Sequence, residues 1–331
     1  MSEGKLGATS PRFEAGDTAG LTEAAEEVGY PLLVKAAAGG GGIGMRRVDD
    51  AARLQAAVEA TCSMAARAFG DSTVFLERFV RRARHVEVQV FGGGDGHVVH
   101  FHDRDCSLQR RFQKIIEEAP APQISAAVRE KMYKAALSLA HQQRYRSAGT
   151  VEFILDAESE EFYFLEMNTR IQVEHPVSEE ITGSDLISLQ LRLAAGEPSR
   201  DVLPSAVPRI GHAIECRLYA ENPDKNFLPS PGTLGMLDLP TGVDGVRIDI
   251  GVAAGDKITA YYDPMIAKVI GWGADRETAI ERVRNALKVI RIEGIKTNRA
   301  FLIATLDHPA FRKGDIGTDF IDTYRDALLG K

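Results

Sequence analysis

Hydrophobic and polar residues follow one another along this chain in two patterns, which predict two kinds of element. Short apolar or alternating runs, typical of strands, occur at 30–35, 74–80, 85–91, 97–101, 150–155, 246–250 and 265–272. Apolar residues spaced three or four apart predict helices over 49–67, 125–144, 184–195 and 276–290. Ser125 and Asp275 stand at N-cap positions, and the glycine-rich turn at 92–96 predicts a hairpin between the strands that flank it.

The stretch 162–176 carries the densest group of chemically useful side chains. Its apolar, aromatic start, Phe162–Leu165, predicts a buried strand, and polar side chains then occupy every second position: Glu166, Asn168, Arg170, Gln172 and Glu174. Because strand side chains have a period of two, we expect all five to point the same way. Oxygen ligands, a bidentate cation and a further carboxylate suit a hard metal, an anion and a proton acceptor. An edge strand with a solvated face is the alternative, which the aromatic start disfavours.

A glycine run directly follows a predicted strand that ends in Lys35. Five of the six residues at 39–44 are glycine, so backbone N–H groups there are free to curl around phosphate oxygens, with Lys35 adding a charge. The spacing matches neither the P-loop nor the dinucleotide-binding glycine pattern, and a flexible surface loop is the alternative. Glu77, near the end of another strand, could accept a hydrogen bond from a ribose hydroxyl or an adenine amine, or lie in water.

Two further groups of charged residues accompany these elements. The segment 103–114 is dense in charge; it could be a solvated loop, but its place between strands favours a cluster of cations around an anion. A turn at 157–160 predicts that the strand carrying Glu152 pairs with the stretch carrying Glu166. Two neighbouring buried carboxylates repel unless a divalent cation lies between them, so we expect a metal there.

Composition limits the classes of protein to consider. With 331 residues, 44% of them hydrophobic, the chain can form a large core in two or three lobes. A net charge of −7 with mixed signs does not indicate the basic surface typical of proteins that bind nucleic acid. No apolar run is long enough to span a membrane, and residues 1–17 lack the apolar core of a signal peptide. Cys62, Cys106 and Cys216 have no paired spacing, which predicts reduced thiols in a cytosol or organelle matrix, and we expect a cytoplasmic protein.

Several segments together resemble the biotin carboxylases, which are ATP-grasp ligases. They are Lys35 with the glycines of 39–44, and the segments 84–87, 103–111, 166–176 and 215–217. The match runs in order from about Gly29 to the C-terminus, and 166–176 is a highly specific part of it. Segments 262–268 and 294–298 look like those of acyl-CoA carboxylase α subunits, with the methylcrotonyl type as a candidate. The resemblance implies an α+β fold with a partial linker and glycine-rich ATP-grasp lid over 1–79, an antiparallel ATP-grasp core over 80–205, and a biotin carboxylase C-terminal domain over 206–331.

The resemblance also implies an activity, in which ATP and bicarbonate form carboxyphosphate and its CO2 passes to the ureido nitrogen of biotin. The residues implied for ATP are Lys35, Gly40, Gly41 and Gly42 at the phosphates, and Glu77, Arg78, Val80, His85 and Gln109 at adenine and ribose. Two Mg2+ (or Mn2+) ions would be bound by Glu152, Glu166 and Asn168. Bicarbonate would be held by Arg170, Gln172, Val173 and Lys114. Glu174 would deprotonate bicarbonate, and Arg217 would stabilise the biotin enolate.

Some features depart from the family pattern. The resemblance begins after the family's N-terminal Rossmann-like domain, which contributes another ATP lysine, and Phe112 stands where a polar residue is common. Phe320 and Ile321, in a weakly matching tail, would close over adenine. No Met-Lys-Met biotinylation site occurs, so biotin would arrive on a separate carrier domain that works with a carboxyltransferase, and a homodimer is expected. Two other functions stay open: another ATP-grasp ligase that joins a carboxylate to an amine, and a catalytically silent fragment for nucleotide binding or assembly.

Overall fold

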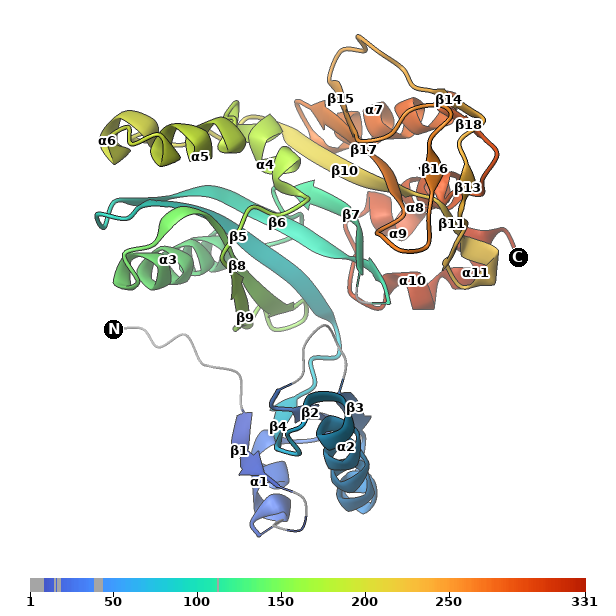
Figure 1. Cartoon of the computed structure of the whole chain (residues 1–331). Helices are drawn as coiled ribbons and strands as arrows, with labels where there is room; N and C mark the ends of the chain where they lie inside the picture. Colours follow the sequence, from blue (N-terminus) through green and yellow to red (C-terminus); the bar gives the residue numbers. More distant parts are fainter. Residues whose placement is uncertain (1–8, 15, 17–18, 39–43, 112) are drawn as a thin grey trace. The chain divides into compact units, whose positions relative to one another are not determined.

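The computed structural model describes residues 9–331 except 15, 17, 18, 39–43 and 112, and Figure 1 draws it in colours that follow the sequence. The chain forms two compact units. Unit 1 comprises 1–81 with 162–164, and unit 2 comprises 82–161 with 165–331. The domain boundaries at 79/80 and 205/206 stay predictions.

Unit 1 is a four-stranded antiparallel sheet with two helices on one face. The order of its strands is β1 (Thr9–Phe13), β4 (Val74–Arg78), β2 (Leu32–Ala36) and β3 (Met45–Val48). The helices are α1 (Leu21–Val28) and α2 (Leu54–Phe69), which follows the short 3-10 turn η1 (Ala51–Arg53). Val34 of β2 and Leu76 of β4 are fully buried against these helices, so Lys35 and Glu77 point to the other face of the sheet.

An eight-stranded sheet forms the centre of unit 2. Its order is β15 (Val246–Ile250), β17 (Met265–Gly273), β10 (His212–Tyr219), β7 (Gln113–Ala119), β6 (Val98–Arg110), β5 (Ala83–Gly93), β8 (Arg146–Asp156) and β9 (Phe162–Asn168). Short strand pairs lie outside it: β11 (Glu221–Asn222) with β12 (Leu228–Pro229), β13 (Gly232–Thr233) with β16 (Lys257–Ile258), and β14 (Met236–Asp238) with β18 (Arg291–Glu293). Because β10 pairs antiparallel with β7, strands from the second half of the chain continue the sheet that contains the β5–β6 hairpin.

Helices cover both faces of this sheet (Figure 1). α3 (Ala126–Gln142) packs on β5 and β6, and α4 (His175–Thr182) packs on β6, β7, β10 and β17. Neighbouring residues of β6 show that these are opposite faces, since Asp103 contacts Arg129 and Tyr133 of α3 whereas Arg104 contacts Ser178 of α4. The other helical segments are α5 (Leu186–Ala194), α6 (Ser199–Val202), η2 (Pro223–Lys225), α7 (Arg276–Val289), α8 (Arg299–Asp307), α9 (Pro309–Arg312), α10 (Phe320–Thr323) and α11 (Arg325–Leu329).

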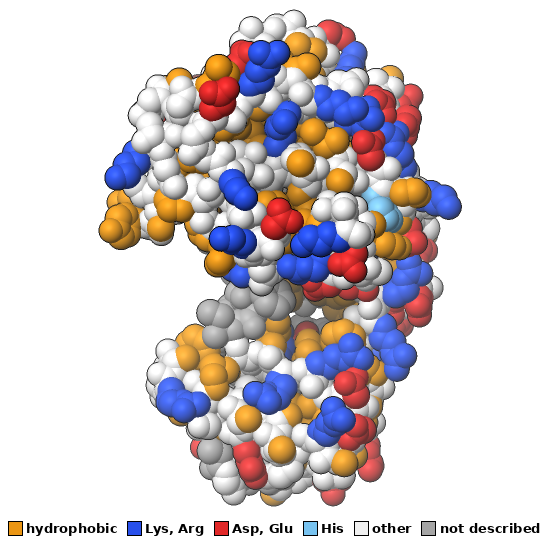
Figure 2. Space-filling view, turned by 90° about the vertical axis from the view of Figure 1, so that its right-hand side faces the viewer, with side chains coloured by type: hydrophobic (Ala, Val, Ile, Leu, Met, Phe, Trp, Pro, Cys, Tyr) orange, Lys and Arg blue, Asp and Glu red, His pale blue; other side chains and the backbone are white. Residues whose placement is uncertain are grey.

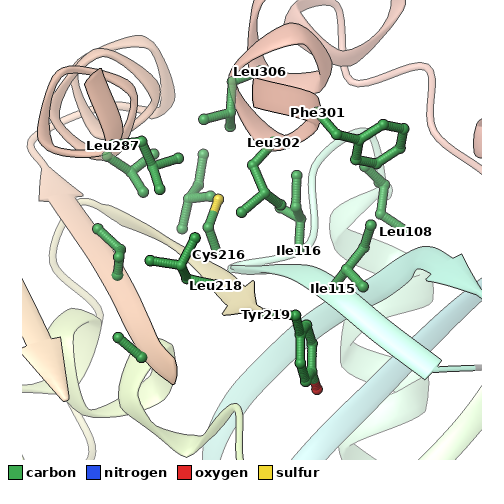
Figure 3. Close-up of a cluster of buried hydrophobic side chains, with 14 of the residues drawn as sticks. Leu108, Ile115, Ile116, Cys216, Leu218, Tyr219, Leu287, Phe301, Leu302 and Leu306 are labelled. Carbon is green, nitrogen blue, oxygen red and sulfur yellow. The ribbon is translucent and has the colours of Figure 1, made fainter. Parts of the chain in front are cut away.

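A large apolar core in unit 2 lies between the sheet and helices α7 and α8 (Figure 3). Ile116 of β7 and Cys216 of β10 belong to it together with Leu302 of α8, and none of the three is more than 2% exposed. Alternate residues of a strand point to opposite faces, so Glu117 and Arg217 point away from this core, toward the face that α4 covers. The apolar core thereby decides which side of the sheet receives the charged residues.

Several predicted elements are confirmed. The hairpin β5–β6 is present, and the ends of helices α2, α3, α5 and α7 lie within five residues of the predicted ends. The side chains of Ser125 and Asp275 accept hydrogen bonds from the backbone N–H groups of Val128 and Thr278, as N-caps do.

Figure 2 shows side chains of both charges intermixed over the visible face. Among the described residues, no helix combines the length and the hydrophobicity required to cross a bilayer.

The predicted strand over 162–174 is wrong in two respects. β9 ends at Asn168, and the chain then turns into α4, so the side chains of Gln172 and Glu174 are not placed by a strand period. β9 is also an edge strand whose Phe164 is 43% exposed, so its aromatic start does not mark a buried strand. The charged segment that begins at Asp103 is the second half of β6 and is buried, which rules out the solvated loop for its described residues up to Arg110.

Candidate active site

Lys114 of β7 lies at the centre of a group of buried carboxylates. Its Nζ is 2.7 Å from Glu87 Oε2, 3.0 Å from Glu152 Oε1 and 2.7 Å from Glu174 Oε1. The acids come from β5, β8 and the turn before α4, and none is more than 4% exposed. Since β5 and β8 place Glu87 directly opposite Glu152, their negative charges converge on one ammonium group.

The lysine and the carboxylates shift one another's pKa values. Burial by itself would lower the pKa of Lys114, but Glu87 and the other negative neighbours outweigh burial and raise the pKa well above its usual value. Burial by itself would raise the pKa of both Glu87 and Glu152. At Glu87, Arg104 and Lys114 outweigh burial and lower the pKa below the ordinary range. At Glu152, His85 and Lys114 do the same. These two carboxylates therefore stay ionised at neutral pH.

Arg104 of β6 is a second, fully buried cation that orders the same region. Its Nε donates to Glu87 Oε1 at 2.6 Å, its Nη1 to Gln89 Oε1 at 2.7 Å and its Nη2 to Gln172 Oε1 at 3.0 Å. Gln172 in turn donates through Nε2 to Glu152 Oε1 at 2.8 Å. Arg104 thus fixes the positions of groups that come from β5 and from the turn after β9.

Arg217 of β10 reaches Glu174 from the other side. Its Nη2 donates to Glu174 Oε2 at 2.9 Å, and its Nε lies 2.6 Å from Glu117 Oε1. Lys114 and Arg217 therefore hold different oxygens of the same carboxylate. Burial and the charge of Glu87 would raise the pKa of Glu174, but these two cations, with Arg104, outweigh them and lower it.

Glu152, Glu166 and Asn168 lie together on the neighbouring strands β8 and β9. Asn168 Nδ2 donates to Glu152 Oε1 at 3.0 Å and lies 3.4 Å from Glu166 Oε1. Glu152 is buried and Glu166 is exposed, so the group opens to solvent on one side. Two carboxylates and an amide oxygen fit Mg2+, a hard cation that binds few protein oxygens and keeps several of its waters.

His85 and Gln109 lie next to this group within unit 2. His85 Nε2 is 3.0 Å from Glu152 Oε2, and His85 Nδ1 is 3.0 Å from Gln109 Nε2. The Cys106 carbonyl also accepts a hydrogen bond from Gln109 Nε2, at 2.8 Å. Both side chains are therefore held in place by groups of the same sheet.

The predicted ATP residues of unit 1 form their own contacts. Lys35 Nζ lies 2.7 Å from Glu77 Oε2, on the face of the sheet opposite to its helices. Arg78 ends β4, and Val80 follows it in the connection to β5. Gly40, Gly41 and Gly42 lie outside the described residues, as does Phe112.

The structure brings most of the predicted residues of unit 2 into one network. Its members are His85, Gln109, Lys114, Glu152, Glu166, Asn168, Gln172, Glu174 and Arg217. Val173 contributes through its carbonyl, which accepts from Lys268 Nζ at 3.1 Å. Arg170 is exposed. Its Nη1 donates to the Ile171 carbonyl and its Nη2 lies 3.5 Å from Asn168 Oδ1, but it makes no ion pair with the acids of the network.

Sequence reasoning missed Glu87, Arg104 and Glu117 as parts of this site. A signal was present for Glu87 and Glu117, because a charged residue in the interior of an otherwise apolar strand is rarely buried without a partner. Glu87 stands between Val86 and Val88, and Glu117 follows an Ile–Ile pair. What the pattern could not supply is the pairing order of the strands, which decides which charges meet.

Comparison with known families and proteins gives independent evidence. Residues 7–202 match the family described as "Carbamoyl-phosphate synthase L chain, ATP binding domain", and residues 215–323 match the "Biotin carboxylase C-terminal domain". Biotin carboxylase 2 of Bacillus subtilis (strain 168) is 49% identical over 306 residues, which cover 92% of this chain and 68% of that protein. This chain belongs to the biotin carboxylase family. The membership confirms the predicted ATP-grasp fold followed by a biotin carboxylase C-terminal domain.

Other relatives extend the comparison. The mitochondrial methylcrotonoyl-CoA carboxylase subunit alpha of Mus musculus is 48% identical over 309 residues, covering 93% of this chain and 43% of that protein. The chain thus spans less than half the length of this relative. The biotin carboxylase domain dimer of Hydrogenobacter thermophilus 2-oxoglutarate carboxylase, crystallised with MgADP, ADP and bicarbonate, has a TM-score of 0.88 and 39% identity, covering 98% of this chain and 71% of that one.

Proposed function

We propose that this chain carboxylates biotin with ATP and bicarbonate, through carboxyphosphate, as the first half-reaction of a biotin-dependent acyl-CoA carboxylase. The observation that carries the proposal is the buried carboxylate of Glu174, whose two oxygens are held by Lys114 and Arg217 beside the acids of β5 and β8. Biotin carboxylase relatives, one of them crystallised with MgADP and bicarbonate, support it.

Glu174 is the base that removes the proton of bicarbonate. In the structure, Lys114 and Arg217 keep its carboxylate ionised and ready to accept that proton. Bicarbonate is an anion and competes with Glu174 for Lys114. When Lys114 turns to bicarbonate, Glu174 loses a cation that lowers its pKa and becomes a stronger base. Arg170, Gln172 and the Val173 backbone orient the bicarbonate.

Transfer of the γ-phosphoryl group to bicarbonate requires positioning and charge neutralisation more than covalent chemistry. Mg2+ held by Glu152, Glu166 and Asn168 would supply that neutralisation at the phosphate oxygens. His85 and Gln109 of unit 2 contact adenine or ribose in this scheme. The assignments of Lys35, Gly40, Gly41 and Gly42 to the phosphates, and of Glu77, Arg78 and Val80 to the nucleoside, rest on the resemblance of their segments to the family.

Arg217 stabilises the enolate that forms on the ureido oxygen when the N–H of biotin loses its proton, which the phosphate released from carboxyphosphate can take, before the nitrogen attacks CO2. A fixed guanidinium at this oxygen lowers the barrier. Biotin is presented by a separate carrier domain, and a carboxyltransferase takes the carboxyl group to its acceptor. A homodimer is part of the proposal, supported by the dimeric domain of the Hydrogenobacter relative.

Arg217→Ala is expected to lower biotin-dependent turnover by roughly 10²–10³, the loss typical of removing one oxyanion-stabilising donor. Bicarbonate-dependent ATP hydrolysis without biotin should fall less, because Lys114 still holds Glu174. Phosphate release with bicarbonate, measured with and without biotin, separates the two. Arg200→Ala, whose side chain is 83% exposed, is the control. Equal losses in both assays would remove this role of Arg217, and phosphate release by the unmodified chain that ignores both bicarbonate and biotin would contradict the proposed function itself.

A further inference from the structure

Glu117 and Glu215 form a second pair of buried carboxylates that the proposed reaction does not use. They stand directly opposite each other on β7 and β10, and are 1% and 0% exposed. Directly opposite residues of antiparallel strands have Cβ atoms about 4.5–5.5 Å apart, so the two carboxyl groups are within reach of each other. Ala119 and Ala213, on the same face of the same strands, pack against Val177 of α4, which seals the pair from water.

The pair has too few partners for two full negative charges. None of its four carboxylate oxygens accepts a hydrogen bond of acceptable geometry from the described residues. Glu117 has an ion-pair partner, since its Oε1 lies 2.6 Å from Arg217 Nε, whereas Glu215 has no salt bridge among those residues. An ionised carboxylate without a partner in a buried site is so unfavourable that such a group binds a proton instead.

The charged groups that face the pair do not supply the missing cation. They are Glu87 of β5, Lys114 of β7, Glu174 before α4, Arg217 of β10 and Lys268 of β17. Lys114 already holds three carboxylates, and Lys268 Nζ lies 3.1 Å from Asp249 Oδ2 and from the Val173 carbonyl. Burial raises the pKa of Glu117 to about 7 despite Arg217, and burial together with Glu117 raises that of Glu215 well above its usual value.

We infer that the Glu117–Glu215 pair holds one proton at neutral pH, with Glu215 as a neutral acid that donates to Glu117, and that ionised Glu117 positions Arg217. Glu117 fixes the guanidinium at Nε and leaves Nη2 for Glu174. A second negative charge on Glu215 would compete for Arg217 and turn it away from Glu174. The protonation state stands on the burial and pairing alone, while the use of Arg217 rests on the proposed function.

Infrared spectroscopy tests the protonation state directly in the full chain. A protonated carboxyl group gives a C=O band separate from those of carboxylates, and we expect this band at about pH 7 and its loss as the pH rises past the coupled titration of the pair. Glu215→Gln should remove the band, and Glu158→Gln, on an exposed turn, should keep it. Absence of the band in the unmodified chain, which needs no variant to fold, would overturn the inference, as would its persistence in Glu215→Gln.

Unfolding as a function of pH gives a second readout. A carboxyl whose folded pKa is raised binds its proton more tightly in the folded state, so its stabilisation is complete below the unfolded value near 4.5 and is lost as pH rises toward the folded value. The melting temperature of Glu215→Gln relative to the unmodified chain should therefore increase between about pH 5 and pH 8. A constant difference would contradict the raised pKa.

Turnover then tests the positioning of Arg217. Glu117→Gln should lower kcat for biotin carboxylation by about tenfold or more, as expected for loss of the ion pair that positions Arg217, with a smaller effect on KM for ATP. Glu215→Gln, whose amide carries the same charge as the neutral acid, should lower kcat far less. In the unmodified chain, activity should decline at high pH as Glu215 ionises, and this decline should be absent in Glu215→Gln. Equal loss in both variants would overturn the positioning role. A chain without any biotin carboxylation would contradict the proposed function, while the infrared and melting results would still decide the state of the pair.

Discussion

Lys114→Gln is expected to destabilise unit 2 by about 3–5 kcal/mol at neutral pH, because it leaves the buried carboxylates of Glu87, Glu152 and Glu174 without their shared cation. Trp272 is the single tryptophan of the chain and lies in β17 of the same sheet. Its fluorescence during urea unfolding therefore reports on this unit. The matched control is Lys134→Gln on α3, whose side chain is 73% exposed and pairs only with Glu130 at 3.5 Å among the described residues.

The control should change the free energy of unfolding by no more than about 0.5 kcal/mol, since exposed ion pairs contribute little. The loss in free energy of unfolding caused by Lys114→Gln should also become smaller as the pH is lowered to about 5. Without the lysine, the folded carboxylates have raised pKa values and bind protons more tightly than the unfolded chain does, so acid favours the folded variant. Equal stability of the two lysine variants at neutral pH would show that the cluster does not depend on Lys114.

Glu174→Gln is expected to lower bicarbonate-dependent ATP hydrolysis by roughly 10²–10⁴, the usual contribution of a general base. The amide cannot accept the proton of bicarbonate, although it keeps the size of the side chain. ATP affinity, measured by calorimetry, should stay within about twofold, because no nucleotide contact is assigned to this residue. Glu158→Gln controls for the loss of one carboxylate elsewhere on the surface.

Two outcomes would contradict the assignment of the base. Unchanged turnover in Glu174→Gln would remove Glu174 from the proton transfer. A parallel loss of ATP affinity would show that the residue acts on the nucleotide site rather than on bicarbonate. Because Arg217 and Lys114 both bind Glu174, the melting temperature of the variant must be measured alongside, so that a loss of folded protein is not counted as a loss of catalysis.

Local pattern was sufficient for much of the fold. Helix α7 begins where Asp275 caps it, and the glycine-rich turn at 92–96 joins β5 to β6, since each is decided by residues a few positions apart. The same reasoning failed after Asn168, where the alternation of polar residues continues but the strand does not. A period of two in polar residues is weak evidence for a strand when the next residues, His175 and Pro176, can begin a helix.

The sequence predicted which residues belong to the candidate site better than it predicted which of them contact one another. Glu166, Asn168, Arg170, Gln172 and Glu174 were singled out by their residue types and spacing, and their individual roles came from the resemblance to a family. Most of the predicted residues in unit 2 lie in the network. Arg104, Glu117 and Glu215 were not identified. The contacts of Glu117 and Glu215 depend on β7 pairing with β10, and those of Arg104 depend on the turn after β9 and on α4 covering that face. Such pairings join segments far apart in the chain, and their register is set by the whole sheet rather than by local sequence.

Transfer of isotopically labelled bicarbonate to biotin measures the proposed reaction itself. The full chain is incubated with ATP, Mg2+, labelled bicarbonate and either free biotin or a biotinylated carrier domain, and the acid-labile carboxyl group on biotin is counted. We expect label on biotin that requires ATP, appears together with an equivalent amount of ADP, and is absent with Glu174→Gln. Hydrolysis of ATP without any label on biotin, from a chain whose nucleotide site is intact, would contradict it.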